Sequence, residues 1–80
     1  MVAYVLIPKV AFDEHRDALL ERARKDSGYG CFQYVGDEVR VAFAHDACAH
    51  FFGGECAKRE IQYGLELGGV RYRPPVLSGR

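Results

Sequence analysis

The chain has 80 residues, in which 11 Lys and Arg balance 11 Asp and Glu, and 49% of the residues are apolar. This length allows one domain with a modest core, and the apolar fraction excludes a disordered chain. The charge balance removes any bulk attraction to nucleic acid or to an acidic membrane, so only local patches remain to be considered.

The longest apolar run, residues 2–7, is far shorter than the roughly 20 residues that a membrane helix needs. No basic region precedes it, as a signal peptide would require. We therefore expect a cytoplasmic, soluble protein with no membrane partner and with reduced thiols at Cys31, Cys48 and Cys56. We expect one domain over residues 1–75 and a flexible tail over 76–80.

The first elements are a strand and a helix. Residues 2–7 are β-branched, aromatic or aliphatic and end at Pro8, which predicts a central strand covered on both faces. Asp13 is the expected cap of the next helix, and Gly28 its stop. The predicted apolar stripe of this helix is Phe12, His15, Leu19, Leu20 and Ala23.

Residues 29–35 and 38–44 alternate with period two on either side of Gly36-Asp37, which predicts a β-hairpin with a two-residue turn. The expected register is Tyr34 opposite Val39, Phe32 opposite Val41, and Gly30 opposite Phe43. One side is then core. The other side is expected to carry Tyr29, Cys31, Gln33, Arg40, Ala42 and Ala44.

Asp46 opens a second predicted helix, and Gly53-Gly54 is expected to end or kink it. Its expected core residues are Ala47, Cys48, Phe51 and Phe52. Residues 55–67 allow two interpretations, either a further helix or a short helix to Glu60 followed by a strand over 61–67. The strand is favoured. It would form a hairpin at Gly68-Gly69 with Leu67 opposite Val70, Leu65 opposite Tyr72, and Glu66 opposite Arg71.

The order strand, helix, hairpin, helix, strand is the split βαβ arrangement. It predicts an α+β protein with a ferredoxin-like antiparallel sheet and two helices on one face, with room for an extra C-terminal strand. This fold carries many unrelated activities, so function has to be argued from particular residues.

The His and Cys residues point to two kinds of candidate chemistry. Zinc accepts His and Cys ligands, so His45, Cys48, His50 and Cys56 form an alternative metal site, although their spacing lacks the close ligand pairs typical of such sites. A nucleophilic Cys48 would need a lowered pKa and a base within reach. Phosphate-loop, GxGxxG, GxSxG and HExxH motifs are absent from the sequence, so we expect a cofactor-free protein that is not an enzyme.

A second alternative is an RNA-binding module. Residues 28–34, Gly-Tyr-Gly-Cys-Phe-Gln-Tyr, resemble the core of the RNP1 element of RNA-recognition-motif domains, and residues 3–5 are similar to the start of their RNP2 element. This resemblance implies that Tyr4 and Tyr29 stack on bases. Arg40, on the same expected sheet face as Tyr29, is the further nucleic-acid-binding residue of this alternative. Ser27 stands where the family has Arg or Lys, and Cys31 where it has a second stacking aromatic. The octamer also lies one strand earlier than in the family.

The favoured interpretation of the same sheet face is a protein interface, because Tyr and Arg beside small residues are typical of interface cores. The expected partner-binding residues are Tyr29, Gln33, Arg40, Arg71 and Arg73. The partner is another protein or a second copy in a homodimer. A small neutral chain without a catalytic motif suits a regulator or inhibitor, for instance one encoded by a phage or other mobile element to block a host defence complex.

Overall fold

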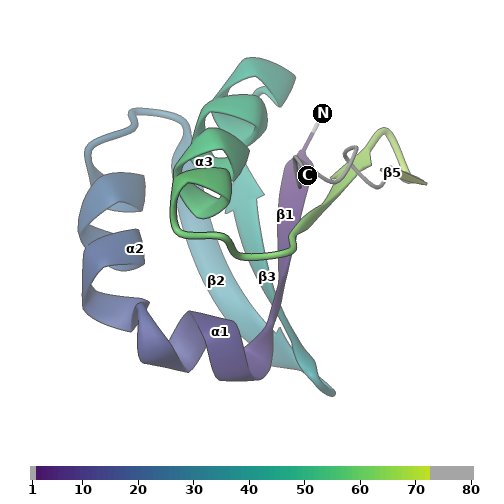
Figure 1. The fold of residues 1–80 in the computed structure, drawn as a ribbon. Coiled ribbons are helices and arrows are strands. Elements are labelled where there is room, and N and C mark those ends of the chain that lie inside the picture. Colours follow the sequence, from purple (N-terminus) through teal and green to yellow (C-terminus); the bar gives the residue numbers. More distant parts are fainter. Residues whose placement is uncertain (1, 73–80) are drawn as a thin grey trace.

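The computed structural model describes residues 2–72. It contains one antiparallel sheet and three helices, and the helices lie together on one side of the sheet (Figure 1). The elements in chain order are β1 (Ala3–Pro8), α1 (Lys9–Glu14), α2 (Arg16–Arg24), β2 (Tyr29–Val35), β3 (Glu38–Phe43), α3 (Asp46–Lys58), β4 (Gly64–Leu67) and β5 (Val70–Tyr72). Arg73 and the predicted tail, 76–80, lie outside the described residues.

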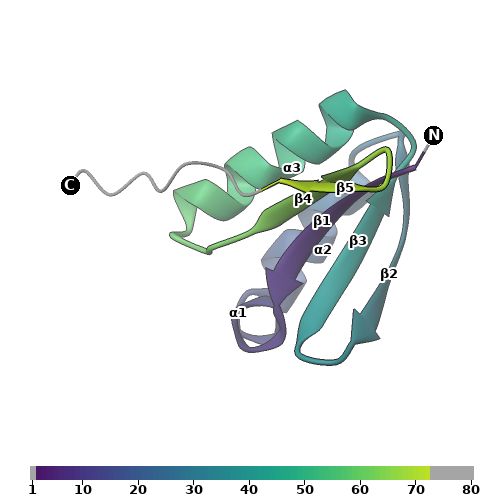
Figure 2. The same cartoon turned by 90° about the vertical axis from the view of Figure 1, so that its right-hand side faces the viewer.

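The sheet is open and has the strand order β2-β3-β1-β4-β5, with every neighbouring pair antiparallel. β1 lies at its centre, as its apolar sequence predicts, but the described helices cover only one of its faces, so the expectation that both faces are covered is wrong. Figure 2 shows the sheet in front of α2 and α3, with no described helix on the near side. The chain is therefore an α+β protein with helices on one face of the sheet, and within residues 2–72 no helix covers the opposite face.

The core lies between the sheet and the helices. Alternate residues of β1 and β3 point into it, and β1 contributes Ala3, Val5 and Ile7, all fully buried. The helices and β4 complete this core with Phe12, Leu19, Leu20, Ala23, Ala49, Phe52, Cys56 and Leu65. Because the helices cover only this side, the intervening residues of the same strands face away from the core.

The structure differs from the first predicted helix in two respects. The chain becomes helical directly after β1, because Pro8 turns it (φ −56°, ψ 135°) and the Lys9 amide donates to the Asp37 carbonyl oxygen at 2.7 Å. His15 (φ −112°, ψ 20°) then separates α1 from α2. Asp13 therefore lies inside α1 and is not a cap, and its carboxylate accepts a hydrogen bond from the Tyr34 hydroxyl at 2.9 Å.

The predicted hairpin is confirmed at its turn, where Val35 pairs with Glu38 and Gly36 has a positive φ of 61°. Phe32 lies opposite Val41 and Tyr34 opposite Val39, as expected. The expected pairing of Gly30 with Phe43 is wrong. A β-bulge between Tyr29 and Phe32 shifts the register, so that Tyr29 pairs with Phe43 and packs against the core with its ring centroid 6.0 Å from that of Phe43.

The expectation that Gly53-Gly54 would end or kink the second helix is corrected, because α3 continues through both glycines to Lys58. Its buried residues are Ala49, Phe52, Gly53 and Cys56. Ala47 and Phe51 were predicted to be core residues, but Ala47 is exposed and Phe51 is 68% exposed. The face of α3 that packs on the sheet therefore differs from the face that the sequence predicts.

The strand interpretation of the C-terminal region is confirmed for β4, which is a strand over Gly64–Leu67. The turn at Gly68-Gly69 has positive φ values of 58° and 82°, which favour glycine. β5 pairs in the expected register, with Leu67 opposite Val70, Glu66 opposite Arg71, and Leu65 opposite Tyr72. The sheet therefore gains a fifth strand beyond β4.

Candidate functional site

The side of the sheet that faces away from the helices is called here the open face. Its side chains alternate with the core residues along each strand and lie next to one another across the strands. The register places Tyr4 beside Ala42 and Glu66, Leu6 beside Arg40 and Gly64, Gln33 beside Arg40, and Glu66 beside Arg71. None of the described helices covers this face (Figure 2).

Arg40 is held at the centre of the open face by two neighbours. Its Nη2 donates to Glu66 Oε1 at 2.7 Å, and its guanidinium carbon lies 4.5 Å from the centroid of the Tyr4 ring. The side chains of Arg40 and Glu66 are only 25% and 17% exposed. Within residues 2–72 the buried Nε of Arg40 has no hydrogen-bond partner, so its charge depends on Glu66 and on the Tyr4 ring.

Arg71 extends this network toward the edge of the sheet. Its Nη2 donates to Glu38 Oε1 at 3.4 Å, and its Nε lies 3.7 Å from Glu66 Oε1. The side chain of Arg71 is 62% exposed, so these contacts are weaker than the Arg40–Glu66 pair. The two arginines and the two glutamates cancel one another, and this network carries no net charge.

The open face is hollowed next to the network. The groove measures about 370 Å³, near the lower end of the range of roughly 300–1,000 Å³ that ligand pockets span. Leu6, which is 4% exposed, lies beside Gly64, and Gly64 has no side chain to fill the space. The groove is lined by Leu6, Pro8, Glu38, Gln62, Tyr63, Gly64, Arg71 and Tyr72.

The structure brings together three of the five residues predicted to bind a partner, because Gln33, Arg40 and Arg71 all lie on the open face. The prediction that Tyr29 joins them is wrong, since the β-bulge turns Tyr29 to the core side. Arg73 lies outside the described residues.

Sequence reasoning missed Leu6, Gly64 and Glu66 as residues of this face. The continuous apolar run of β1 hid which of its residues point away from the core. The one signal for Glu66 was its expected position opposite Arg71, which places both side chains on the same face of the sheet. This pairing is present.

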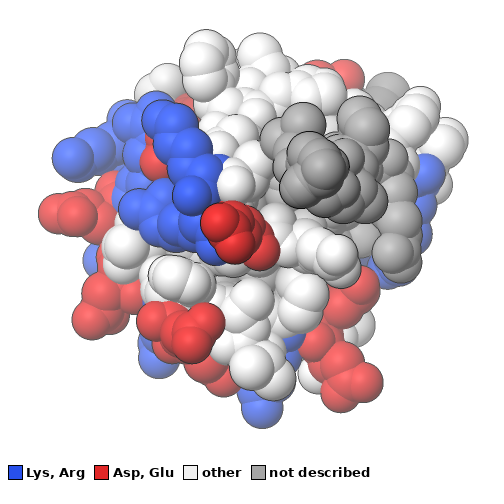
Figure 3. Space-filling view, viewed as in Figure 1, with Lys and Arg blue, Asp and Glu red and all other residues white. Residues whose placement is uncertain are grey.

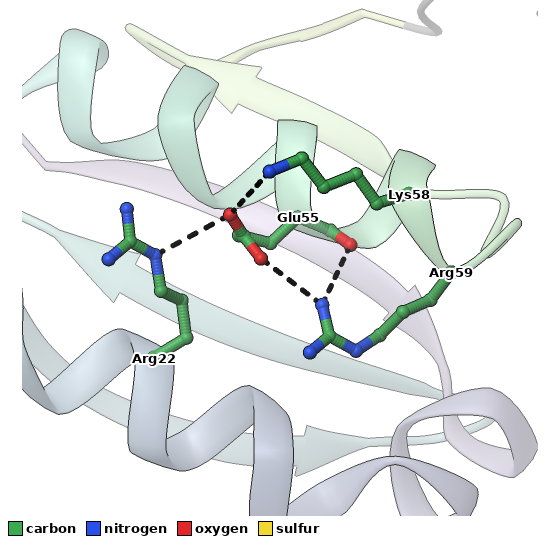
Figure 4. A network of polar contacts seen from close by, with 4 residues as sticks. All are labelled: Arg22, Glu55, Lys58 and Arg59. Atoms are coloured by element: carbon green, nitrogen blue, oxygen red, sulfur yellow. Dashed lines mark hydrogen bonds and ion pairs between the residues drawn. The ribbon is translucent and has the colours of Figure 1, made fainter.

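A second charged cluster lies on the helix side of the molecule. Glu55 on α3 is contacted by three cations, with Arg59 Nη1 at 3.2 Å, Lys58 Nζ at 3.3 Å and Arg22 Nε at 3.7 Å (Figure 4). Lys and Arg side chains gather over this side of α2 and α3 (Figure 3). The hydrogen bond from Arg59, followed by that from Lys58, lowers the pKa of the Glu55 carboxyl.

A shallow groove of about 300 Å³ lies between the C-terminal end of α2 and the first half of α3. Its lining mixes charges of both signs with exposed and buried rings, and consists of Arg22, Ala23, Lys25, Asp26, Ser27, Phe43, Phe51 and Phe52. Its described lining has no buried polar side chain that would select a ligand, so this groove does not indicate a class of ligand.

The predicted metal ligands are not brought together. Cys56 is buried in the core and Cys48 lies against Gly28, where a Cβ on the glycine would be 2.8 Å from the Cys48 Sγ. Within residues 2–72 no three His, Cys, Asp or Glu side chains are close enough to hold a metal ion. The alternative site of His45, Cys48, His50 and Cys56 therefore has no geometric basis there.

The thiols also differ from an activated nucleophile. The Cys48 thiol donates a hydrogen bond to the Asp26 carboxylate, which raises the pKa of Cys48. Burial raises the pKa of Cys56 to about 12. A nucleophilic cysteine needs the opposite shift, because its thiolate is the reactive form.

Comparisons with protein-family models, with curated proteins and with solved structures find no match to this chain. Within the described part of the chain, no helix combines the length and the apolar character needed to cross a membrane.

Proposed function

We propose that this protein acts as a small non-enzymatic regulator or inhibitor that binds another protein through its open sheet face. The single observation that carries the proposal is the hollow at Leu6 and Gly64 on a face that no described helix covers and whose arginines and glutamates pair with one another. Such a role works by occupying the partner and needs no catalytic group. A mobile-element inhibitor of a host complex is one example, and it rests on the small size of the chain and on the absence of catalytic motifs from the sequence.

The groove suits an apolar side chain of the partner. Besides the nearly covered Leu6, its lining includes Pro8, Tyr63 and Tyr72, and burying a Leu or Phe side chain of the partner against their apolar atoms would contribute about 1.5–3 kcal/mol. Glu38 and Arg71 stand at its rim and are partly exposed, so both can exchange their mutual contact for groups of a partner. An apolar pocket with a polar rim is the common arrangement of a binding hot spot.

The charge balance of the face favours a protein over RNA. Nucleic-acid binding depends on unpaired Lys and Arg that neutralise phosphates. Arg40 is already paired with Glu66 and stacked on Tyr4, so neither Arg40 nor the Tyr4 ring is available without breaking that contact. Tyr29, the other aromatic of the RNA-binding alternative, packs on the opposite side of the sheet.

We also assign the fold to the ferredoxin-like class. The order β2-β3-β1-β4, with β3 between β1 and β2, supports this assignment, since it corresponds to two βαβ units split by an antiparallel strand. In this assignment α1 and α2 together take the place of the first helix, and β5 is an addition at the edge.

The proposed function is tested by a substitution that places a side chain in the groove. In Gly64→Val the new Cβ lies 3.5 Å from the Tyr72 carbonyl oxygen and 3.9 Å from Leu6, which is ordinary contact, so the fold should hold. Gly54→Ala on the exposed side of α3 is the matched control, because a Cβ at Gly54 has no atom within 4 Å. Wild type and both variants, tagged, are used to capture partners from the native cell, with and without nuclease treatment.

Captured proteins are then purified and titrated against each variant. A partner that binds wild type and Gly54→Ala, and that binds Gly64→Val roughly tenfold or more weakly, supports the proposal. The proposal fails if Gly64→Val binds that partner as tightly as wild type. It also fails if the interaction disappears with nuclease treatment, which would support the RNA alternative.

A further inference from the structure

The sheet has two edge strands, and one of them, β2, lacks the features that normally protect an edge from pairing with another strand. β2 and β5 are the terminal strands of the sheet, and β5 has three residues and carries Arg71. β2 has seven residues, Tyr-Gly-Cys-Phe-Gln-Tyr-Val, none of them charged and none of them proline. Protein edges are normally protected by shortness, charge or proline, because an unpaired strand is a template for another strand.

The regular part of this edge runs from the bulge to the turn. Val35 and Glu38 flank the two-residue turn, so they exchange hydrogen bonds within the hairpin. The main-chain N–H and C=O groups of successive residues point to opposite sides of a strand. Those of Phe32 and Tyr34 therefore point away from β3. Tyr34 and Val35 are 44% and 46% exposed. Within residues 2–72 no strand pairs with this side of β2, so an incoming strand finds its donors and acceptors beside exposed apolar side chains.

We propose that a second copy of this chain pairs with β2 in an antiparallel manner, with the two-fold axis at Gln33. Phe32 of each copy then lies opposite Tyr34 of the other, and these residues exchange main-chain hydrogen bonds. The two Gln33 side chains meet on the axis. The two five-stranded sheets become one continuous sheet, and the open faces of both copies lie on the same side of it.

The side chains of β2 fit a copy of themselves. Phe32 and Tyr34 already contact each other, with ring centroids 6.1 Å apart, and Phe32 lies 5.3 Å from Phe12. Pairing would join the two aromatic clusters into one, which aromatic cross-strand pairs favour. An uncharged strand also meets no like charge when it pairs with its own copy. This self-complementarity is what a two-fold interface requires.

Substitutions at Gln33 test the axis. Within one protomer Gln33 lies opposite Arg40, so Gln33→Glu is compatible with the fold. Across the axis it places two carboxylates against each other. We therefore expect the dissociation constant of the dimer to rise roughly tenfold or more at low salt. Mixing Gln33→Glu protein with Gln33→Lys protein should restore association as a heterodimer. Sedimentation over a range of concentrations measures each state, with circular dichroism as the check of folding.

A cross-link tests the register. Gln33→Cys in a Cys31→Ser background brings two thiols onto the axis, within the Cβ separation of about 3.5–4.5 Å that a disulfide needs. We expect a covalent dimer under mild oxidation. Val10→Cys in the same background is the control, because Val10 is 82% exposed on α1 and is not a residue of the pairing strand β2.

The proposal is overturned if the wild-type chain is monomeric at all concentrations, which would leave the edge to a strand of another protein. It is also overturned if Gln33→Glu dimerises as well as wild type, or if Val10→Cys cross-links as readily as Gln33→Cys. These readouts need no binding partner, so their outcome is independent of the proposed function of the open face.

Discussion

Gly53 lies directly against the ring of Tyr63, so that a Cβ at residue 53 would be 2.5 Å from Tyr63 Cε2 and 2.9 Å from Cζ. This contact joins α3 to the segment that leads into β4. It explains why a glycine occupies the buried side of a helix that gains nothing from glycine's flexibility. The neighbouring Gly54 is exposed, and a Cβ there has no atom within 4 Å.

The two glycines should therefore respond to alanine in opposite ways. Gly53→Ala should lower the free energy of unfolding by about 1–3 kcal/mol, because the Tyr63 ring has to move. Gly54→Ala should raise it by about 0.4–1 kcal/mol, because alanine favours the helix and nothing obstructs it. Denaturant unfolding of both variants measures these changes. In a Tyr63→Ala background the penalty of Gly53→Ala should disappear, and its persistence there would contradict this explanation.

The two ion pairs of the open face should differ in their contribution to stability. Glu66→Ala leaves the largely buried Arg40 guanidinium without its carboxylate, and we expect a loss of about 1–3 kcal/mol. Glu38→Ala breaks the exposed contact with Arg71, and we expect a loss of about 1 kcal/mol or less. Urea unfolding at low and high salt compares the two. Equal losses would show that Glu66 is not the residue that holds Arg40.

Glu55 should make stability depend on pH in the acid range. Hydrogen bonds from Arg59 and Lys58 lower its pKa below the ordinary value of 4.5, so its stabilising effect is present above that value and is lost as the pH falls further, through its lowered pKa. We expect Glu55→Gln to be less stable than wild type at neutral pH. The difference should shrink as the pH falls below 4.5.

Unfolding curves over a series of pH values measure this convergence. Glu21→Gln on α2 is the control, because the exposed Glu21 has no ion pair within residues 2–72. A Glu55→Gln variant whose stability parallels that of wild type at every pH would refute the role of the cluster.

The three cysteines should react with iodoacetamide at different rates. Cys31 is exposed and should be modified first at neutral pH. Cys56 is buried and its pKa is raised to about 12, so it should react only when the protein opens or unfolds. Peptide mapping by mass spectrometry after short labelling times gives each rate, and labelling in denaturant is the control. Modification of native Cys56 at the rate of Cys31 would contradict the burial of its thiol.

Local chemistry allowed much of the fold to be predicted. The Gly36-Asp37 and Gly68-Gly69 turns depend on residues that accept unusual backbone angles, so both hairpins follow from short stretches of sequence. The central place of β1 follows from its unbroken apolar run. Three of the five predicted binding residues reached the open face because strand alternation fixed their side.

The errors arose where distant contacts overrode local preference. Gly53 makes room for Tyr63, ten positions further along, and does not end α3, a role that the Gly-Gly pair alone could not reveal. The early start of α1 involves the contact of Lys9 with Asp37 in the hairpin turn. The inward turn of Tyr29 results from a bulge that period-two alternation cannot reveal.

The bulge gives β2 a surplus residue. Between the pairs that join Tyr29 to Phe43 and Phe32 to Val41, β3 has the single residue Ala42, whereas β2 has both Gly30 and Cys31. Deleting Gly30 would therefore straighten the strand and still leave both aromatic side chains against the same neighbours. A chain one residue shorter at this position would keep the same fold with a regular ladder between β2 and β3.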